Sequence, residues 1–244
     1  MTDSPITFFQ NLEAGFLRIL EARAKAPGDA VVDALTQQAF DVLDGNVALQ
    51  PAGSPAIACA KGCSTCCSLR VTATAPEIFL MARYVRLIDR SPQGAALNLV
   101  HRVQVAYRDL AGLDERARFA HQWPCPLLIK GICIVHSVRS LACRGHAAFD
   151  AQACRAAARG KDVDVPVSET HLMMRSLIQN SLQSALRRAG LAWGLYELCQ
   201  GLALALDDKA SQPAWLTGGD SLGPVVADCD MAALAHSYNE LHRS

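Results

Sequence analysis

The chain has 244 residues, of which 51% are hydrophobic and 19% charged, so it can bury a sizeable core and intrinsic disorder is not expected. Basic and acidic residues each number 23, which gives a formal net charge of zero. A protein that binds nucleic acid through its phosphates usually carries a basic excess or a basic stripe. Neither is present, and we expect no nucleic-acid partner.

The N-terminal segment predicts two helices. Ser4 can cap the first helix with Pro5 at its first position, and apolar residues follow at helical spacing. The PGD tripeptide at 27–29 ends this helix, and a second is expected from about Ala30 to Leu49. A loop is expected at 50–55, directly before the first cysteines.

The N-terminus lacks the basic start and unbroken apolar run of a secretory signal. No stretch approaches the roughly 18 apolar residues of a membrane span. We therefore expect a cytoplasmic protein without a membrane partner, in a compartment where thiols are kept reduced.

The middle of the chain mixes helices with one short β element. Thr74 and Glu77 form a capping box ahead of an apolar run, which predicts a helix. Ser91, followed by proline, predicts the start of a further helix that reaches about Leu113. The apolar segment CPLLIKGICIV at 125–135 is interrupted by KG, which predicts two short strands joined by a tight turn.

The last third is again helical. Ser168 can cap a helix that reaches about Ala189, and a second helix is expected from Leu191 to Leu206. A final helix is expected to begin near Asp230.

We predict a mainly α fold, a compact helical domain with a small β-hairpin and cysteine-rich metal-binding loops. A single domain is expected over 1–244. Its cysteine-cluster core at 57–155 is flanked by N-terminal helices within 4–49 and C-terminal helices within 168–242.

The cysteine pattern carries the functional information. Four thiols fall within CAKGCSTCC at 59–67, and the whole set reads C-x3-C-x2-C-C, a long gap, then C-x7-C-x9-C-x10-C. Clustered cysteines in a reducing compartment more often bind metal or do redox chemistry than form structural disulfides. The candidate metal ligands are Cys59, Cys63, Cys66, Cys67, Cys125, Cys133, Cys143 and Cys154.

Thiolates are the ligands that soft metals prefer, and four of them complete a zinc site or hold an iron–sulfur cluster. Adjacent side chains point in different directions, so Cys66 and Cys67 cannot easily face one ion together. One of the two can serve a second metal, bridge, or stay unligated. Cys199, inside an apolar helix, and Cys229 are interpreted as structural cysteines.

These residues resemble the YkgJ-type cysteine-cluster family, described as a zinc- or iron-chelating domain. Its first motif, C-x2/3-C-x2-C-C, is matched at 59–67, and CPLLIKGICIVHSVRSLACR at 125–144 resembles its second motif, with Arg139 and Arg144 in family positions. Cys154 resembles the eighth family cysteine. The resemblance covers about residues 57–155 and implies that the eight cysteines chelate zinc or iron. His136 and Ser140 replace a tyrosine and a proline of the family pattern.

Three functions stay open at this stage. The first is a metal-binding module that chelates iron, in an iron–sulfur cluster, or zinc. The second is an iron–sulfur enzyme related to flagellin lysine methylase, a relative that bears this kind of cluster. The third is a metal-free thiol redox sensor in which Cys66 and Cys67 oxidise. The sequence identifies neither a catalytic residue nor a protein partner.

Overall fold

The structure, a computed structural model, describes residues 4–49, 53, 55–223 and 229–242, without the side chains of residues 115, 116 and 119. It is mainly helical, with two small antiparallel sheets of two strands each. The predicted helical class and the predicted hairpin are therefore confirmed. Most of the loop expected at 50–55 lies outside the described residues.

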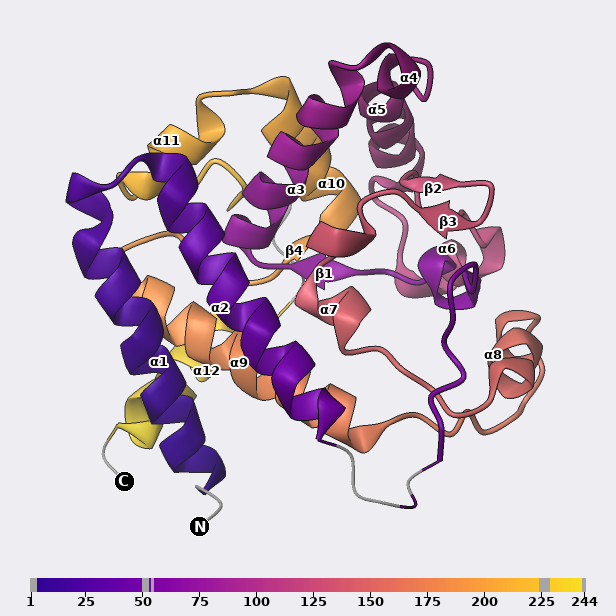
Figure 1. The fold of residues 1–244 in the computed structure, drawn as a ribbon, viewed down its shortest axis with the longest axis horizontal. Coiled ribbons are helices and arrows are strands. Elements are labelled where there is room, and N and C mark those ends of the chain that lie inside the picture. The colour runs from indigo at the N-terminus through magenta and orange to yellow at the C-terminus, as the bar shows by residue number, and fades with distance from the viewer. Residues whose placement is uncertain (1–3, 50–52, 54, 224–228, 243–244) are drawn as a thin grey trace.

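A scaffold of five helices makes up most of the core. Helix α1 packs along α9 and α2, α2 packs against α3, and α3 packs against α10 (Figure 1). The bounds are α1 (Pro5–Glu21), α2 (Gly28–Ala48), α3 (Ala75–Asp89), α9 (Glu169–Arg188) and α10 (Leu198–Asp207).

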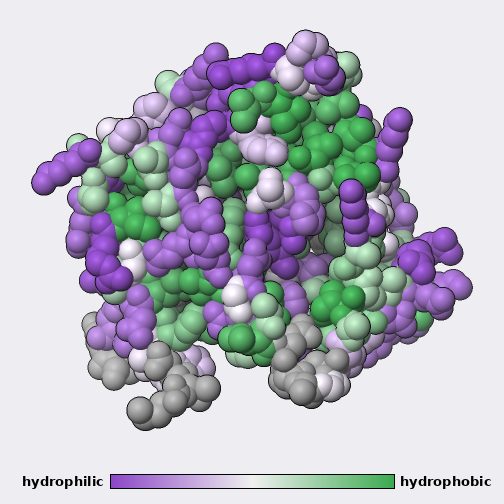
Figure 2. All heavy atoms as spheres, viewed as in Figure 1, coloured by the Kyte–Doolittle hydropathy of each residue, from purple (hydrophilic) through white to green (hydrophobic). Residues whose placement is uncertain are grey.

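The ends of the scaffold helices follow the sequence signals. Ser4 Oγ accepts a hydrogen bond from Thr7 N at 3.1 Å, which starts α1 as predicted. Thr74 and Glu77 form the predicted capping box at the start of α3. Figure 2 shows hydrophilic side chains across one face between smaller hydrophobic areas, as expected when most apolar residues are buried.

Shorter helices cover the scaffold. They are η1 (Ala22–Lys25), α4 (Pro92–Ala95), α5 (Leu99–Leu110), α6 (Glu115–His121), α11 (Ser211–Leu216) and α12 (Met231–Leu241). Asp230 caps α12 by accepting from Ala233 N at 2.9 Å, close to the predicted start. Within the described ranges, no helix is both long and apolar enough to cross a membrane.

The remaining elements are short and surround the cysteines. They are η2 (Thr65–Ser68), β1 (Thr72–Ala73), β2 (Leu128–Ile129), β3 (Ile132–Cys133), η3 (His136–Val138), α7 (Leu141–Arg144), α8 (Ala151–Ala158) and β4 (Tyr196–Glu197). In the β2–β3 hairpin, Lys130 and Gly131 have φ values of 51° and 77°. Two positive φ values in a two-residue loop match the twist of the flanking strands, which explains the tight turn.

Two expectations need correction. The single helix predicted from Ser91 to about Leu113 is wrong, because Asn98 adopts a left-handed φ of 53° and separates α4 from α5. A Cβ on Gly94 would lie 1.9 Å from the Ile88 carbonyl oxygen, so the turn into α4 requires glycine. The helix expected from Leu191 to Leu206 is also wrong at its start, because α10 begins only at Leu198, directly after β4. The pairing of β1 with β4, Thr72 opposite Glu197, was not predicted.

Candidate cysteine site

The eight candidate ligands lie on different kinds of backbone. Cys59 and Cys63 are exposed on a loop that turns at Gly62, with a φ of 91°, and Cys66 and Cys67 lie in η2. The other four are half-buried: Cys125 precedes β2, Cys133 is on β3, Cys143 is in α7 and Cys154 is in α8. The expectation that loops carry the cysteines therefore needs correction for four of them, which occupy helical elements: Cys66, Cys67, Cys143 and Cys154. Cys133 lies in the predicted hairpin.

The backbone brings the two cysteine motifs together. Cys125 N donates a hydrogen bond to Cys67 O at 2.8 Å, across a long stretch of intervening chain. The Gly62 carbonyl oxygen is 3.9 Å from the position of a Cβ at Gly131, so the hairpin turn approaches the first loop. Figure 1 shows β2, β3 and α8 on the opposite side of the molecule from α1. The two motifs therefore share one region, which we call the cysteine region (57–67 and 125–155).

A first group of thiols lies around Cys125. Burial, together with the charges of Cys143 and Cys133, raises the pKa of the Cys125 thiol to about 12. Burial also raises the pKa of Cys143 to about 11, and charges on Cys133 and Cys66 add to the effect. These thiols are close enough for the charge of one to affect the next, so ionisation of one thiol disfavours ionisation of its neighbours.

The vicinal pair differs from the other thiols. A hydrogen bond between the side chains of Cys66 and Cys67 lowers the pKa of Cys66 to about 7 and raises that of Cys67. Cys66 is therefore the candidate thiol with the most thiolate character at neutral pH.

A second group lies around Cys154. Burial raises the pKa of the Cys154 thiol, and the charges of Cys59, Cys63 and Cys66 raise it further. Cys154 therefore faces the first motif rather than Cys125 and Cys133. The charge of Cys66 affects the pKa values of thiols in both groups.

Glu77 connects the scaffold to the cysteine region. Its Oε2 accepts from Thr74 N at 2.7 Å and from Thr74 Oγ1 at 2.6 Å, and its Oε1 accepts from Leu141 N at 2.6 Å. Leu141 is the first residue of α7, which carries Cys143. The carboxyl group is fully buried, and burial raises its pKa. Glu77 thus joins the starts of α3 and α7, and the sequence predicted only the first of these contacts.

Arg144 holds the second motif in shape. Its guanidinium donates to Arg139 O at 3.0 Å, to Ser137 O and to Asp44 Oδ2 at 2.8 Å. Its Cζ also lies 4.1 Å from the centroid of the Phe40 ring, on α2. These contacts fix the turn before Cys143 against the scaffold and give Arg144 a structural role.

The two substituted positions of the second motif also make local contacts. Ser140 caps α7, with its Oγ accepting from Cys143 N at 3.4 Å. Arg139 donates to His136 O at 2.9 Å and lies 3.0 Å from His136 Nδ1. The pKa of His136 is lowered by burial and by the nearby arginines. His136 thus packs with Arg139 within the motif.

The two cysteines outside the pattern differ in their surroundings. Cys199 is buried with Ala106 and Leu110 near the first thiol group, where burial raises its pKa well above the usual value and charges on Cys125 and Cys143 also raise it. Cys229 Sγ contacts Met231 Sδ at 3.4 Å. Beside Cys199, Arg118 and Glu197 form a buried ion pair at 3.0 Å. Sequence analysis missed this pair, because no local pattern relates the two residues.

The donors of this site are of the type that soft metals prefer, but its side chains are not placed to hold a metal ion. Among the described residues, no group of three or more His, Cys, Asp or Glu side chains could hold a metal ion as placed. The ten cysteines, all within the described ranges, form no disulfide. A metal ion could therefore bind here only if the thiol side chains moved from these positions.

Comparison of the chain with protein-family models, with curated proteins and with solved structures gave no match. The resemblance to the YkgJ-type family therefore depends on the two cysteine motifs alone.

Proposed function

We propose that the protein binds metal through its cysteine region, chelating iron in an iron–sulfur cluster, or zinc. The observation that supports this most is the hydrogen bond from Cys125 N to Cys67 O, which joins the two motifs. The ligands we assign are Cys59, Cys63, Cys66, Cys67, Cys125, Cys133, Cys143 and Cys154.

The chemistry of the donors agrees with this proposal. Thiolates prefer zinc, iron–sulfur clusters and other soft metals. The thiols around Cys125 oppose one another's ionisation, and a bound cation removes that penalty because it stabilises the thiolates directly. When bound, the metal or cluster supplies a crosslink between the loop at 59–63, η2, the hairpin, α7 and α8.

The number of candidate ligands limits the number of metal sites. One group of thiols surrounds Cys125, the other surrounds Cys154, and the charge of Cys66 affects thiols in both. Eight thiolates can complete two tetrahedral sites of four ligands each. The proposal therefore allows one or two metal sites per chain.

Elemental analysis of anaerobically purified protein tests the proposal. Iron with acid-labile sulfide identifies a cluster, and zinc in a colourless protein identifies a structural site. Cys143→Ala should lose metal, whereas the control variant Cys229→Ala should keep it, because Cys229 is exposed beside Met231 and is not an assigned ligand. Protein without iron or zinc, or a Cys143→Ala variant with full metal content, would contradict the proposal.

A thiol redox sensor is the second candidate, and the low pKa of Cys66 next to Cys67 favours it. Hydrogen peroxide would oxidise the pair to a vicinal disulfide: the two thiols lose two protons and two electrons, and the peroxide becomes two waters. Mass spectrometry of metal-free protein tests this. If the pair acts as a sensor, peroxide treatment should lower the protein mass by two hydrogens and remove two of the thiols that an alkylating reagent can modify. Unchanged thiols after peroxide treatment would exclude this function.

A further inference from the structure

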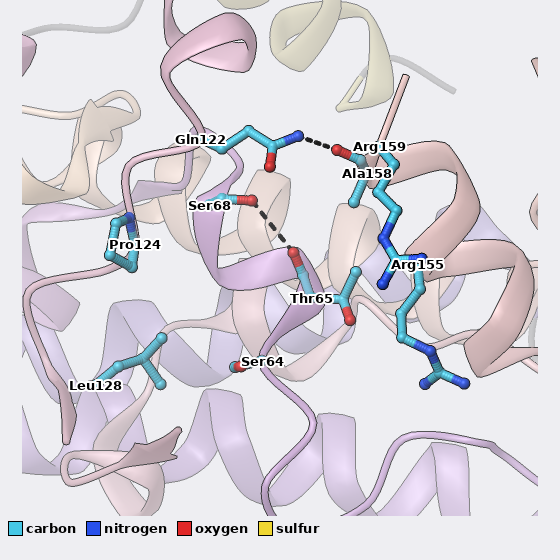
Figure 3. A pocket seen from close by; sticks show the side chains of 9 residues that line it. All are labelled: Ser64, Thr65, Ser68, Gln122, Pro124, Leu128, Arg155, Ala158 and Arg159. Atoms are coloured by element: carbon cyan, nitrogen blue, oxygen red, sulfur yellow. Dashed lines mark hydrogen bonds between the residues drawn. The ribbon is translucent and has the colours of Figure 1, made fainter. Parts of the chain in front are cut away.

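A pocket of about 260 Å³ lies beside the cysteine region, between η2, the segment before β2, and α8 (Figure 3). Arg155 and Arg159 lie on the α8 side of this pocket, and Pro124 and Leu128 lie on the opposite side. The amide of Gln122 donates to the Ala158 carbonyl oxygen and connects the two sides. The pocket is thus built from three segments that the fold brings together.

The polar groups of the pocket are mainly donors and cations. The side chains of Arg155 and Arg159 form no hydrogen bond or ion pair with the part of the chain that the structure describes. Ser64, Thr65 and Ser68 add three hydroxyls, of which only Ser68 has a partner within that part, the Thr65 carbonyl oxygen at 3.2 Å. None of the residues that line the pocket is acidic. Two arginine side chains therefore line this space without a neutralising carboxylate among the lining residues.

We propose that this pocket binds a small molecule through a phosphate group. Arginine guanidinium groups recognise phosphate and carboxylate through paired hydrogen bonds. Two such groups, with the hydroxyls of Ser64 and Thr65, offer more donors than the two oxygens of a carboxylate can use. A phosphate group has three terminal oxygens and matches the donor set better.

The size and the apolar wall limit the ligand further. Pockets for drug-sized ligands measure roughly 300–1,000 Å³, so this pocket suits a phosphate ester of a few carbon atoms. Pro124, Leu128 and Ala158 provide an apolar surface for those carbon atoms. The turn η2 forms one wall through Thr65 and Ser68, whereas Cys66 and Cys67 of the same turn do not line the pocket. The binding site itself does not depend on the proposed metal.

Calorimetric titration of the full chain with inorganic phosphate, glycerol 3-phosphate and malonate tests the proposal, at constant ionic strength. Glycerol 3-phosphate should bind more tightly than inorganic phosphate, because it also contacts the apolar wall, and malonate should bind least. Arg155→Gln and Arg159→Gln should each weaken phosphate binding by about tenfold or more. The control Arg90→Gln, at an exposed arginine that ends α3, should leave binding unchanged.

Three results would overturn the proposal. They are an absence of saturable phosphate binding, equal weakening by Arg90→Gln, and tighter binding of malonate than of either phosphate compound. Metal content is measured in every variant, because Arg155 follows Cys154 directly. Phosphate binding lost with metal content intact supports the pocket, whereas loss of metal in Arg155→Gln would assign that arginine to the cysteine site instead.

Discussion

The scaffold and the cysteine region differ in what stabilises them. In α1, α2 and α9, the side chains of Phe16, Leu35 and Leu182 have no exposed surface, so hydrophobic burial stabilises these helices. In the cysteine region all eight candidate ligands are exposed or half-buried, on a loop and on elements of two to eight residues. Elements this short are not stable alone. The comparison indicates that the cysteine region depends on specific polar contacts and, in our proposal, on metal ligation.

The largest expected effect is in the scaffold. Leu20→Ala removes a fully buried side chain and should lower the free energy of unfolding by about 2–5 kcal/mol. The matched control Leu87→Ala, at a residue that is 60% exposed, should change it by less than about 0.5 kcal/mol. Chemical denaturation measures both. Similar effects in the two variants would contradict the assignment of the core.

Glu77 tests the connection between the two regions. Glu77→Ala leaves two buried N–H donors and a hydroxyl without their acceptor and should cost about 2–3 kcal/mol. Amide exchange in α7 should rise more than exchange in α1, because Leu141 N loses its partner. Glu169→Ala, at an exposed position in the first turn of α9, is the control. Unchanged exchange in α7 would show that Glu77 does not hold this helix.

Substitution of Arg144 should lower the free energy of unfolding by less than Glu77→Ala does, and its effect should be more local. Arg144→Lys keeps the charge but loses the planar fork that reaches Ser137, Arg139 and Asp44, and should cost about 1–2 kcal/mol. The ion pair itself contributes little of this, because Asp44 is largely exposed. Chemical denaturation of Arg144→Lys and of the control variant Arg90→Lys measures the difference in their free energies of unfolding. Equal stability of the two variants would mean that the contacts to the turn before Cys143 are dispensable.

Local sequence signals correctly predicted the helix starts and the hairpin turn, because interactions between nearby residues determine these features. The Ser4 cap, the capping box and the KG turn of the hairpin each depend on residues a few positions apart. The helix predicted from Ser91 to about Leu113 was wrong because apolar spacing does not reveal the left-handed conformation of Asn98.

Contacts between distant segments could not be predicted. Two-residue strands such as β1 and β4 carry too little pattern to reveal their pairing. No local pattern indicates the contact of Glu77 with Leu141 N either, because the two residues are far apart in the sequence. The spacing of the cysteines identified the candidate site, but the arrangement of its sulfur atoms depends on how loops and helices pack in three dimensions.

Hydrogen exchange before and after metal removal tests the central claim most directly. The protein is purified anaerobically, and one portion is treated with a chelator. We predict faster exchange at 57–67 and 125–155 after chelation, with unchanged exchange in α1 and α9, because ligation stabilises only the cysteine region. Equal exchange in both portions, or a uniform increase across all helices, would contradict the account.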